Sequence, residues 1–332
     1  AIPNGVIFDW MGKTYTDKEG TEAANLKAAE MRDKFQDWVF ADPDRAEVLA
    51  RAYNDENNNY VTRQYDGAMM TFPGKVPDEI IKFRKHQRNA IARIVQDRTA
   101  LLDHVVGAGK TFTVISAAME LKRTGLAKKS MIAVPNHLVK QWAADFYRLY
   151  PGANILATTK KDFLGPNRRR FLARIATGDW DAVIVAHSSF GFIAPAPEFE
   201  QEFNQRQVAD IMATITAVKA QGDEKDPKNK RTIKRLAKMK EGLEQRIKAL
   251  RDRPMDSLLD FGQIGVDQLF VDEAHLFKNL MFSTKMQGVS GLGDGTGSQR
   301  AYDMYVKTQQ IMEANGRGQG VVFATGTPIS NS

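Results

Sequence analysis

The chain has 332 residues, 42% of them hydrophobic, which is enough for a sizeable core and about two domains. It carries 47 Lys and Arg against 40 Asp and Glu, so its net charge of +7 is compatible with a polyanionic partner. The lack of cysteine excludes disulfides and thiolate zinc sites. No apolar run reaches the roughly 18 residues of a membrane span, and the sequence does not open with a signal-peptide pattern. We therefore expect no membrane partner and a cytoplasmic location.

Residues 1–79 are expected to form a mainly helical accessory segment. Apolar residues recur at helical spacing over residues 21–40, and Asp42 with Pro43 stops the pattern. A second short helix is expected over residues 43–54. Trp38 is interpreted as a packed core residue, with a base-stacking platform as the alternative. Residues 60–74 predict an irregular or short-strand link that ends in a turn at 72–74.

Residues 80–332 alternate between apolar strand patterns and helical patterns. Strands are expected over residues 99–102, 129–134, 154–157, 181–186, 268–271 and 321–324, and helices over residues 111–123, 136–150, 167–177 and 301–314. This order predicts an α/β fold, a parallel sheet with helices on both faces.

An insertion at residues 190–264 interrupts this rhythm. Two long helices are expected over residues 198–220 and 230–251, and the second repeats apolar residues at the spacing of a hairpin seam. Residues 228–253 hold eleven Lys or Arg against three acids, a local charge of +8. The face that contains Lys230, Arg231, Lys234 and Arg235 is either a contact for nucleic-acid phosphates or a solvated surface that keeps the hairpin soluble.

Two further segments allow more than one interpretation. A second basic cluster, formed by Lys160, Lys161, Arg168, Arg169 and Arg170, is either a nucleic-acid contact or a solvated surface. Residues 281–300 are rich in Gly, Ser and Thr and are expected to form a flexible loop, which is either passive or ordered by nucleotide or DNA.

The string Gly107-Ala108-Gly109-Lys110-Thr111 follows the predicted strand at 99–102. Its glycines would let backbone N–H groups face phosphate oxygens at a helix N-terminus. Lys110 would reach the β- and γ-phosphates of ATP, and the Thr111 hydroxyl would hold Mg²⁺. The first glycine of the usual P-loop pattern is replaced by His104, so an ordinary strand-to-helix turn is the alternative when this string is taken alone.

Two more polar strings follow predicted strands. Asp272 and Glu273 come directly after residues 268–271, and Thr325-Gly326-Thr327-Pro328 follows residues 321–324. Because parallel strands share their carboxyl edge, all three strings should meet in one cleft. Asp272 would hold Mg²⁺ through water, and Glu273 would orient or deprotonate the attacking water.

Together these strings resemble superfamily-two helicases and translocases, most closely the Swi/Snf-type ATPases with a DEAH box. The resemblance covers about residues 80–332 and implies one RecA-like P-loop lobe that hydrolyses ATP. It further implies that Gln87 reads adenine, that His275 couples the nucleotide site to Thr325, Gly326 and Thr327, and that the residues after two strands track the DNA backbone. The residues to which that last role transfers are Pro135, Asn136, His137 and His187.

The sequences of the motifs are most similar to helicase segments of large bacterial mobile-element and phage proteins. Those proteins often carry a DNA methyltransferase in another part of the polypeptide. The chain starts with Ala1 and stops one residue after Asn331, inside the third motif, so we expect a fragment whose second lobe is absent and whose turnover is weak. The sequence therefore predicts a motor on double-stranded DNA that uses ATP and Mg²⁺. An RNA or single-strand helicase and a nucleotide-binding scaffold are the alternatives.

Overall fold

The computed structural model describes residues 6–10, 13–58, 63–163, 167–221, 227–251, 259–280 and 298–327. The chain divides into two compact units, Ala1–Gln64 and Tyr65–Ser332. The second unit thus begins at residue 65 rather than at 80. The reason is that Phe72 is buried against the ring of Phe83, with 5.0 Å between ring centroids, in the core of that unit.

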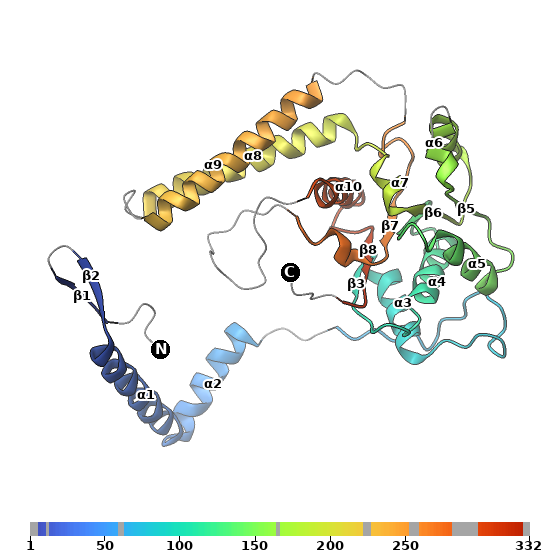
Figure 1. The fold of residues 1–332 in the computed structure, drawn as a ribbon. Coiled ribbons are helices and arrows are strands. Elements are labelled where there is room, and N and C mark those ends of the chain that lie inside the picture. The colour runs from blue at the N-terminus through green and yellow to red at the C-terminus, as the bar shows by residue number, and fades with distance from the viewer. Residues whose placement is uncertain are drawn as a thin grey trace. The chain divides into compact units, whose positions relative to one another are not determined.

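The first unit is an antiparallel hairpin followed by two helices. These elements are β1 (Val6–Trp10), β2 (Lys13–Asp17), α1 (Lys18–Phe40) and α2 (Pro43–Asn57) (Figure 1). Asp17 caps α1 by accepting a hydrogen bond from the Gly20 N–H, and Asp42 caps α2 with Pro43 in the first helical position. Both helices confirm the sequence prediction, whereas the hairpin was not predicted.

The prediction that Trp38 packs in a core is wrong. Its side chain is 50% exposed, and the Arg45 guanidinium lies 3.9 Å from the centroid of its ring. Leu26, Met31 and Phe35 on the same helix are also exposed. Helical spacing identifies an apolar face but does not supply its partner, and no described element of this unit covers this face.

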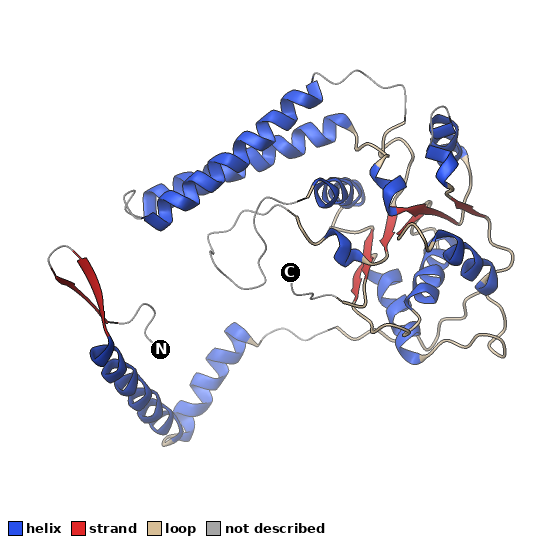
Figure 2. Cartoon of the chain, viewed as in Figure 1, coloured by secondary structure: helices blue, strands red, loops and turns tan. Residues whose placement is uncertain are grey.

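The second unit is built on a sheet of six parallel strands, in the order β3-β8-β7-β4-β6-β5 (Figure 2). The strands are β3 (Thr99–Leu102), β4 (Ser130–Val134), β5 (Ile155–Ala157), β6 (Ala182–Ala186), β7 (Gln268–Val271) and β8 (Val321–Ala324). Every residue of β4, β6 and β7 is buried, as expected for strands covered on both faces. The predicted α/β fold is confirmed.

Helices cover both faces of this sheet. One face packs against α3 (Lys85–Asp97), α4 (Lys110–Arg123) and α5 (Val139–Leu149), and the other against α6 (Asn167–Thr177), α7 (His187–Gly191) and α10 (Gln299–Asn315). Two short 3-10 helices, η1 (Lys160–Phe163) and η2 (Ala274–Phe277), complete the unit. The sequence did not predict α3 and α7, and it placed the start of α5 three residues early, because residues 136–138 form a turn.

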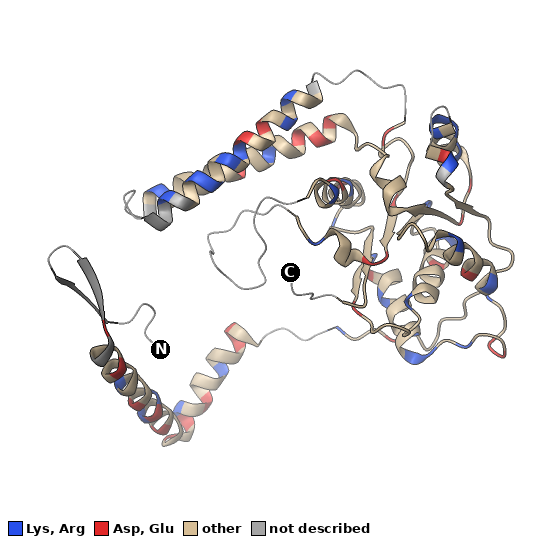
Figure 3. Ribbon diagram, viewed as in Figure 1, with Lys and Arg blue, Asp and Glu red and all other residues tan. Residues whose placement is uncertain are grey.

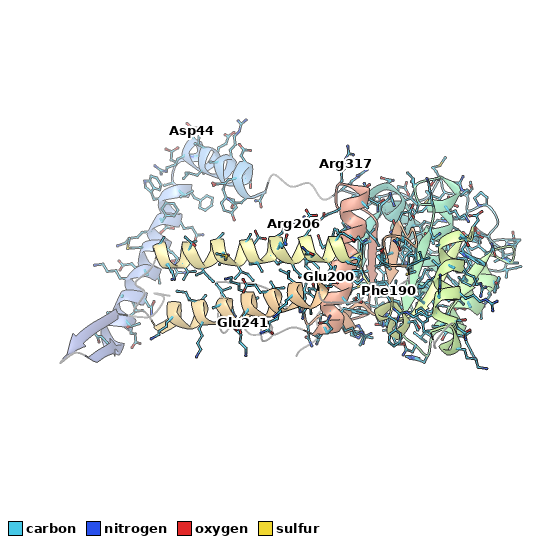
Figure 4. The ribbon with its side chains drawn as sticks, turned by 90° about the horizontal axis from the view of Figure 1, so that it is seen from above. Asp44, Phe190, Glu200, Arg206, Glu241 and Arg317 are labelled. Carbon is cyan, nitrogen blue, oxygen red and sulfur yellow. The ribbon has the colours of Figure 1, made fainter. Side chains whose placement is uncertain are left out.

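The insertion forms the predicted hairpin of two long helices, α8 (Pro197–Gln221) and α9 (Pro227–Arg251). Ile211 of α8 packs against Leu236, Met239 and Leu243 of α9. Figure 4 shows the two helices side by side, with Glu200 and Arg206 on the part of α8 beside α10. Most of the predicted flexible loop, residues 281–297, lies outside the described residues.

The base of this hairpin is fixed to α10. Phe203 of α8 packs with Tyr302 and Val306, and the Tyr302 hydroxyl donates a 2.7 Å hydrogen bond to the side-chain oxygen of Asn204. Arg206 forms a 3.0 Å ion pair with Glu313 near the other end of α10. The hairpin is therefore packed against α10, a helix that also packs against the sheet.

Candidate functional site

Three polar strings meet at the carboxyl edge of the sheet. They follow β3, β8 and β7, which are neighbours in that order. Beyond the strands themselves, the Thr325 N–H donates to the Leu102 carbonyl at 3.0 Å, and the Asp272 N–H donates to the Ala133 carbonyl at 2.9 Å. The loop before α4, the acidic pair and the Thr-Gly-Thr string therefore start side by side.

The loop before α4 holds two glycines in the left-handed backbone conformation. Gly107 and Gly109 have φ angles of +81° and +83°, which favour glycine, and α4 begins at Lys110 directly after them. A Cβ atom at Gly109 would lie 2.4 Å from the Gln87 side-chain nitrogen, so glycine is required here for space as well. The Lys110 ammonium donates to the carbonyls of His104 and Val105, at 2.8 and 3.3 Å.

Gln87 holds this loop from α3. Its side chain is 6% exposed, and its amide nitrogen donates to the Gly109 carbonyl at 3.2 Å while its oxygen accepts from the Arg84 N–H at 3.0 Å. His86 contacts the loop as well, since its Nε2 lies 2.9 Å from the Ala108 carbonyl. The described contacts of Gln87 are structural, and its predicted recognition of adenine stays a prediction.

His104 stands where the P-loop pattern has its first glycine. Its ring packs edge-on against His86, with 5.5 Å between centroids. Burial, and then the neighbouring His86, lower the pKa of His104. The departure from the pattern therefore places a second imidazole on the same side of the loop as His86.

Asp272 and Glu273 differ in environment although they are adjacent. Asp272 is 8% exposed, and burial, followed by the charge of Glu273, raises its pKa to about 6. None of the described Lys or Arg side chains forms an ion pair with Asp272. The charge of Lys110 and hydrogen bonds from Trp142 and the Glu273 backbone act in the opposite direction. The carboxyl of Asp272 and the hydroxyl of Thr111 are oxygen donors of the kind that Mg²⁺ prefers.

A hydrogen-bonded network joins the acidic pair to β8. His275 Nδ1 lies 3.1 Å from a Glu273 carboxylate oxygen and 2.9 Å from Thr325 Oγ1, and Oγ1 also accepts the Thr327 N–H at 3.1 Å. Because a carboxylate only accepts, we assign the proton of the His275 ring to Nδ1. We name this Glu273, His275 and Thr325 arrangement the relay.

Gly326 brings the relay next to the P-loop. A Cβ atom at this position would lie 3.5 Å from the Lys110 ammonium and 2.9 Å from a methyl group of Val106. An alanine methyl group would therefore press against the Val106 side chain, which the glycine avoids. The string after β8 therefore contacts the phosphate loop on one side and the acidic pair, through His275, on the other.

The residues expected after β4 and β6 line one cavity, which we name the α7 cavity. Its volume is about 660 Å³, and its lining includes Pro135, Asn136, His137, His187, Ser188, Phe192, Phe277, Arg300 and Asp303. The Asn136 side-chain oxygen accepts from the backbone and the hydroxyl of Ser188, at 3.2 and 3.1 Å. Four of these residues, Pro135, Asn136, His137 and His187, are those that the sequence named as nucleic-acid contacts, and that role stays a prediction.

His187 is buried in the wall of this cavity. Burial, and then the charge of Arg300, lower its pKa to about 4, so the ring is neutral near pH 7. Its Nδ1 lies 2.9 Å from the Arg300 guanidinium, and its ring packs edge-on against Phe277 at 4.9 Å. Since a guanidinium only donates, Nδ1 is the acceptor in this hydrogen bond.

The basic cluster around α6 is divided. Lys161, Arg169 and Arg170 are exposed, whereas the Arg168 side chain donates to the Phe192 carbonyl. The side chain of Lys160 lies outside the described residues. Three of the five predicted cations are thus available at the surface.

The basic surface of α9 contains an ordered set of lysines. Lys230, Lys234 and Lys238 are exposed and follow one another at intervals of four residues, and we name them the α9 stripe (Figure 3). They lie in the half of α9 that is nearer the tip of the hairpin. Arg235 is half-buried, and the side chain of Arg231 lies outside the described residues.

Sequence reasoning missed Arg300, Ser188 and the buried pair of Asp303 and Lys307. The Arg300 contact with His187 joins positions 113 residues apart. None of these residues belongs to a recognisable string, so only the register of α10 against the sheet could have revealed them.

The fold and the placement of the three strings define a helicase-type α/β lobe. A family model described as a probable helicase domain matches residues 93–332, and the chain belongs to this family. A domain of unknown function, DUF8437, matches residues 7–59. No match is found among curated proteins.

Among solved structures, the chain is similar to the Sulfolobus solfataricus SWI2/SNF2 ATPase core in complex with dsDNA. The identity is 11% and the TM-score 0.35, with 79% of this chain and 34% of that chain covered. The chain thus spans about a third of the length of that structure. No helix in the described part of the chain has the length and apolar character needed to cross a membrane.

Proposed function

We propose that this chain is the ATP-binding lobe of a Swi/Snf-like motor with a DEAH box, which couples ATP hydrolysis to movement along double-stranded DNA. The observation that carries the proposal is the relay, which links the acidic strand end to β8 beside the phosphate loop. Nucleotide binding at the loop and a movement of the Thr-Gly-Thr string would then both alter the hydrogen bonds of the relay.

The chemistry of the nucleotide site follows from the residues that surround it. The N–H groups of the loop would bind phosphate oxygens, and Lys110 would exchange its two carbonyl partners for them. When bound with ATP through Thr111 and Asp272, Mg²⁺ would supply Lewis-acid stabilisation of phosphate charge. Glu273 would orient the attacking water and take its proton, while His275 holds the carboxylate in place.

Nucleic acid would be recognised through its phosphates rather than its sequence. The candidate contacts are the loop residues at the α7 cavity, the exposed cations of α6 and the α9 stripe. Each lysine that neutralises a phosphate releases counterions and so lends affinity that falls with salt. We extend the proposal to the larger protein: a second RecA-like lobe would complete the nucleotide site, in a mobile-element or phage polypeptide that also carries a methyltransferase.

Binding measurements on this chain test the proposal, because the resemblance implies that turnover needs a second lobe. A fluorescent ATP analogue with Mg²⁺ should bind wild type and not Lys110→Ala, in which the ammonium at the loop is lost. Fluorescence anisotropy with labelled duplex DNA, single-stranded DNA and RNA should rank the duplex first.

Two outcomes would contradict the proposal. Preferred binding of RNA or of a single strand would replace the duplex motor by an unwinding helicase. Equal binding of the analogue by wild type and Lys110→Ala, with both proteins folded by circular dichroism, would show that the loop is not a nucleotide site. The second result would remove the ATP-driven motor altogether.

A further inference from the structure

The α7 cavity contains a cation that the motifs do not account for. Arg300, the second residue of α10, lines the cavity with its side chain exposed, and within the described part of the chain it forms no ion pair. Its guanidinium is nevertheless held on two sides. His187 accepts its hydrogen bond, and the Phe277 ring lies 4.4 Å away in cation–π contact.

This arrangement fixes the guanidinium without neutralising its charge. A carboxylate partner would have cancelled the charge, whereas a neutral imidazole and an aromatic ring orient it and leave it positive. Removal of Arg300 from water lowers its pKa, and no nearby acid opposes that effect. The remaining N–H groups of a guanidinium whose conformation is already restricted are available to an anion at little entropic cost.

Asn136 adds an amide donor to the wall of this cavity. The Ser188 backbone N–H can only donate, so the oxygen of the Asn136 amide must face Ser188 and its NH₂ group is left over. Asp303 is the one carboxylate in the lining, and its oxygen accepts from the buried Lys307 ammonium at 2.6 Å. With that acid paired, the cavity carries the net charge of Arg300.

We infer that the α7 cavity binds a phosphodiester group of duplex DNA and that Arg300 is its phosphate-binding cation. The ligand is an oxyanion because the wall offers one oriented cation together with amide donors. The inference rests on the proposed function and adds to it a residue of α10, outside every motif. The exposed Phe192 and Leu276 provide an apolar wall against which sugar carbons would pack.

A matched pair of charge-removing variants tests this inference. Arg300→Gln removes the cation at the cavity, and Arg317→Gln removes an exposed cation just beyond the other end of α10 (Figure 4). Anisotropy with a fluorescein-labelled duplex is measured between about 50 and 200 mM salt. We expect Arg300→Gln to bind about tenfold more weakly, as expected for one lost charge-assisted contact, with a salt slope smaller by about 0.9.

Two further measurements separate a phosphate contact from a structural role. Arg300→Lys, which keeps the charge but loses the planar fork, should recover part of the affinity. The affinity for the fluorescent ATP analogue should stay within about twofold of wild type in all three variants, because neither Arg300 nor Arg317 lies in the loop before α4. Circular dichroism verifies that each variant is folded.

Each outcome decides the inference. Equal duplex affinity of Arg300→Gln and Arg317→Gln would overturn it while leaving the proposed function intact. An equal loss of duplex and nucleotide affinity in Arg300→Gln would also overturn it, because Arg300 would then act through the packing of η2. A wild-type chain that binds no duplex would overturn the proposed function and this inference together.

Discussion

Lys307 is the most deeply buried cation among the described residues, and its pairing with Asp303 sets a measurable part of the stability of the lobe. The side chain of Lys307 is 0% exposed. Its ammonium donates to an Asp303 carboxylate oxygen at 2.6 Å and to the Phe190 carbonyl at 2.7 Å, and it lies 4.3 Å from the centroid of the Phe190 ring. Asp303→Asn keeps the shape and one acceptor but leaves the cation without its counter-charge.

The size of the effect can be bounded from both sides. Removal of one partner of a buried pair costs about 3 to 5 kcal/mol. The upper bound follows from the option of burying Lys307 as a neutral amine. Deprotonation at pH 7 of a group with an ordinary pKa of 10.5 costs about 5 kcal/mol, so the loss in D303N cannot exceed that value. At this domain size, roughly 2 °C per kcal/mol implies a fall in Tm of roughly 6 to 10 °C.

The loss should depend on pH in a defined direction. Burial lowers the pKa of Lys307, and Asp303 opposes that effect, so D303N lowers the pKa further. The unfolded chain then binds more protons than the folded variant, and the stability of D303N rises with pH relative to wild type. We expect the difference in free energy of unfolding between wild type and D303N to become smaller as the pH rises from 7 toward the ordinary pKa of lysine.

Urea unfolding of the full chain at several pH values measures this gap. The double variant D303N/K307M serves as the control, because it removes the buried charge together with its partner and should lie within about 1.5 kcal/mol of wild type. A loss below about 1 kcal/mol in D303N that does not change with pH would contradict this prediction, since Lys307 would then not be a buried cation in the native state.

Four other variants test the packing and the surface charge of the second unit. Gly326→Ala should weaken binding of the ATP analogue several-fold, because its Cβ would lie 2.9 Å from a Val106 methyl group, whereas Gly242→Ala, in open space on α9, should stabilise the chain by about 0.5 to 1 kcal/mol. Tyr302→Phe should lower the free energy of unfolding by about 1 to 2 kcal/mol, because the buried side chain of Asn204 loses its partner; an unchanged value would argue against this bond. Replacing the three lysines of the α9 stripe with glutamines should reduce the slope of log affinity against log salt for duplex DNA by up to about 2.7. An unchanged slope would show that the stripe is a solvated surface that does not contact DNA.

The parts of the fold that the sequence predicted are those with a local signal. The six strands of the sheet are short apolar runs, and the order of strands and helices was enough to indicate a parallel sheet. The convergence of the three polar strings followed from that topology, because parallel strands end at one edge. Helix spacing likewise located α8 and α9, although not the register that places Tyr302 beneath them.

The parts that escaped prediction depend on contacts distant in sequence. Trp38 shows that an apolar helical face does not reveal whether another element covers it. Gln87 was assigned to adenine by resemblance, whereas its described partners are the loop and its own helix cap. Arg300 and Lys307 occur in an ordinary amphipathic helix, and the groups that contact them come from α7 and η2.

The hairpin insertion has the geometry of a lever arm. With 25 residues in each helix, it extends for roughly 37 Å, so a rotation of only about 5° at its base would carry its tip through about 3 Å. That travel is close to the rise of about 3.4 Å along the helix axis for each nucleotide of one DNA strand. Because the base is packed on α10, and α10 leads into β8 and the Thr-Gly-Thr string, a displacement of one nucleotide at the tip corresponds to a small adjustment next to the phosphate loop.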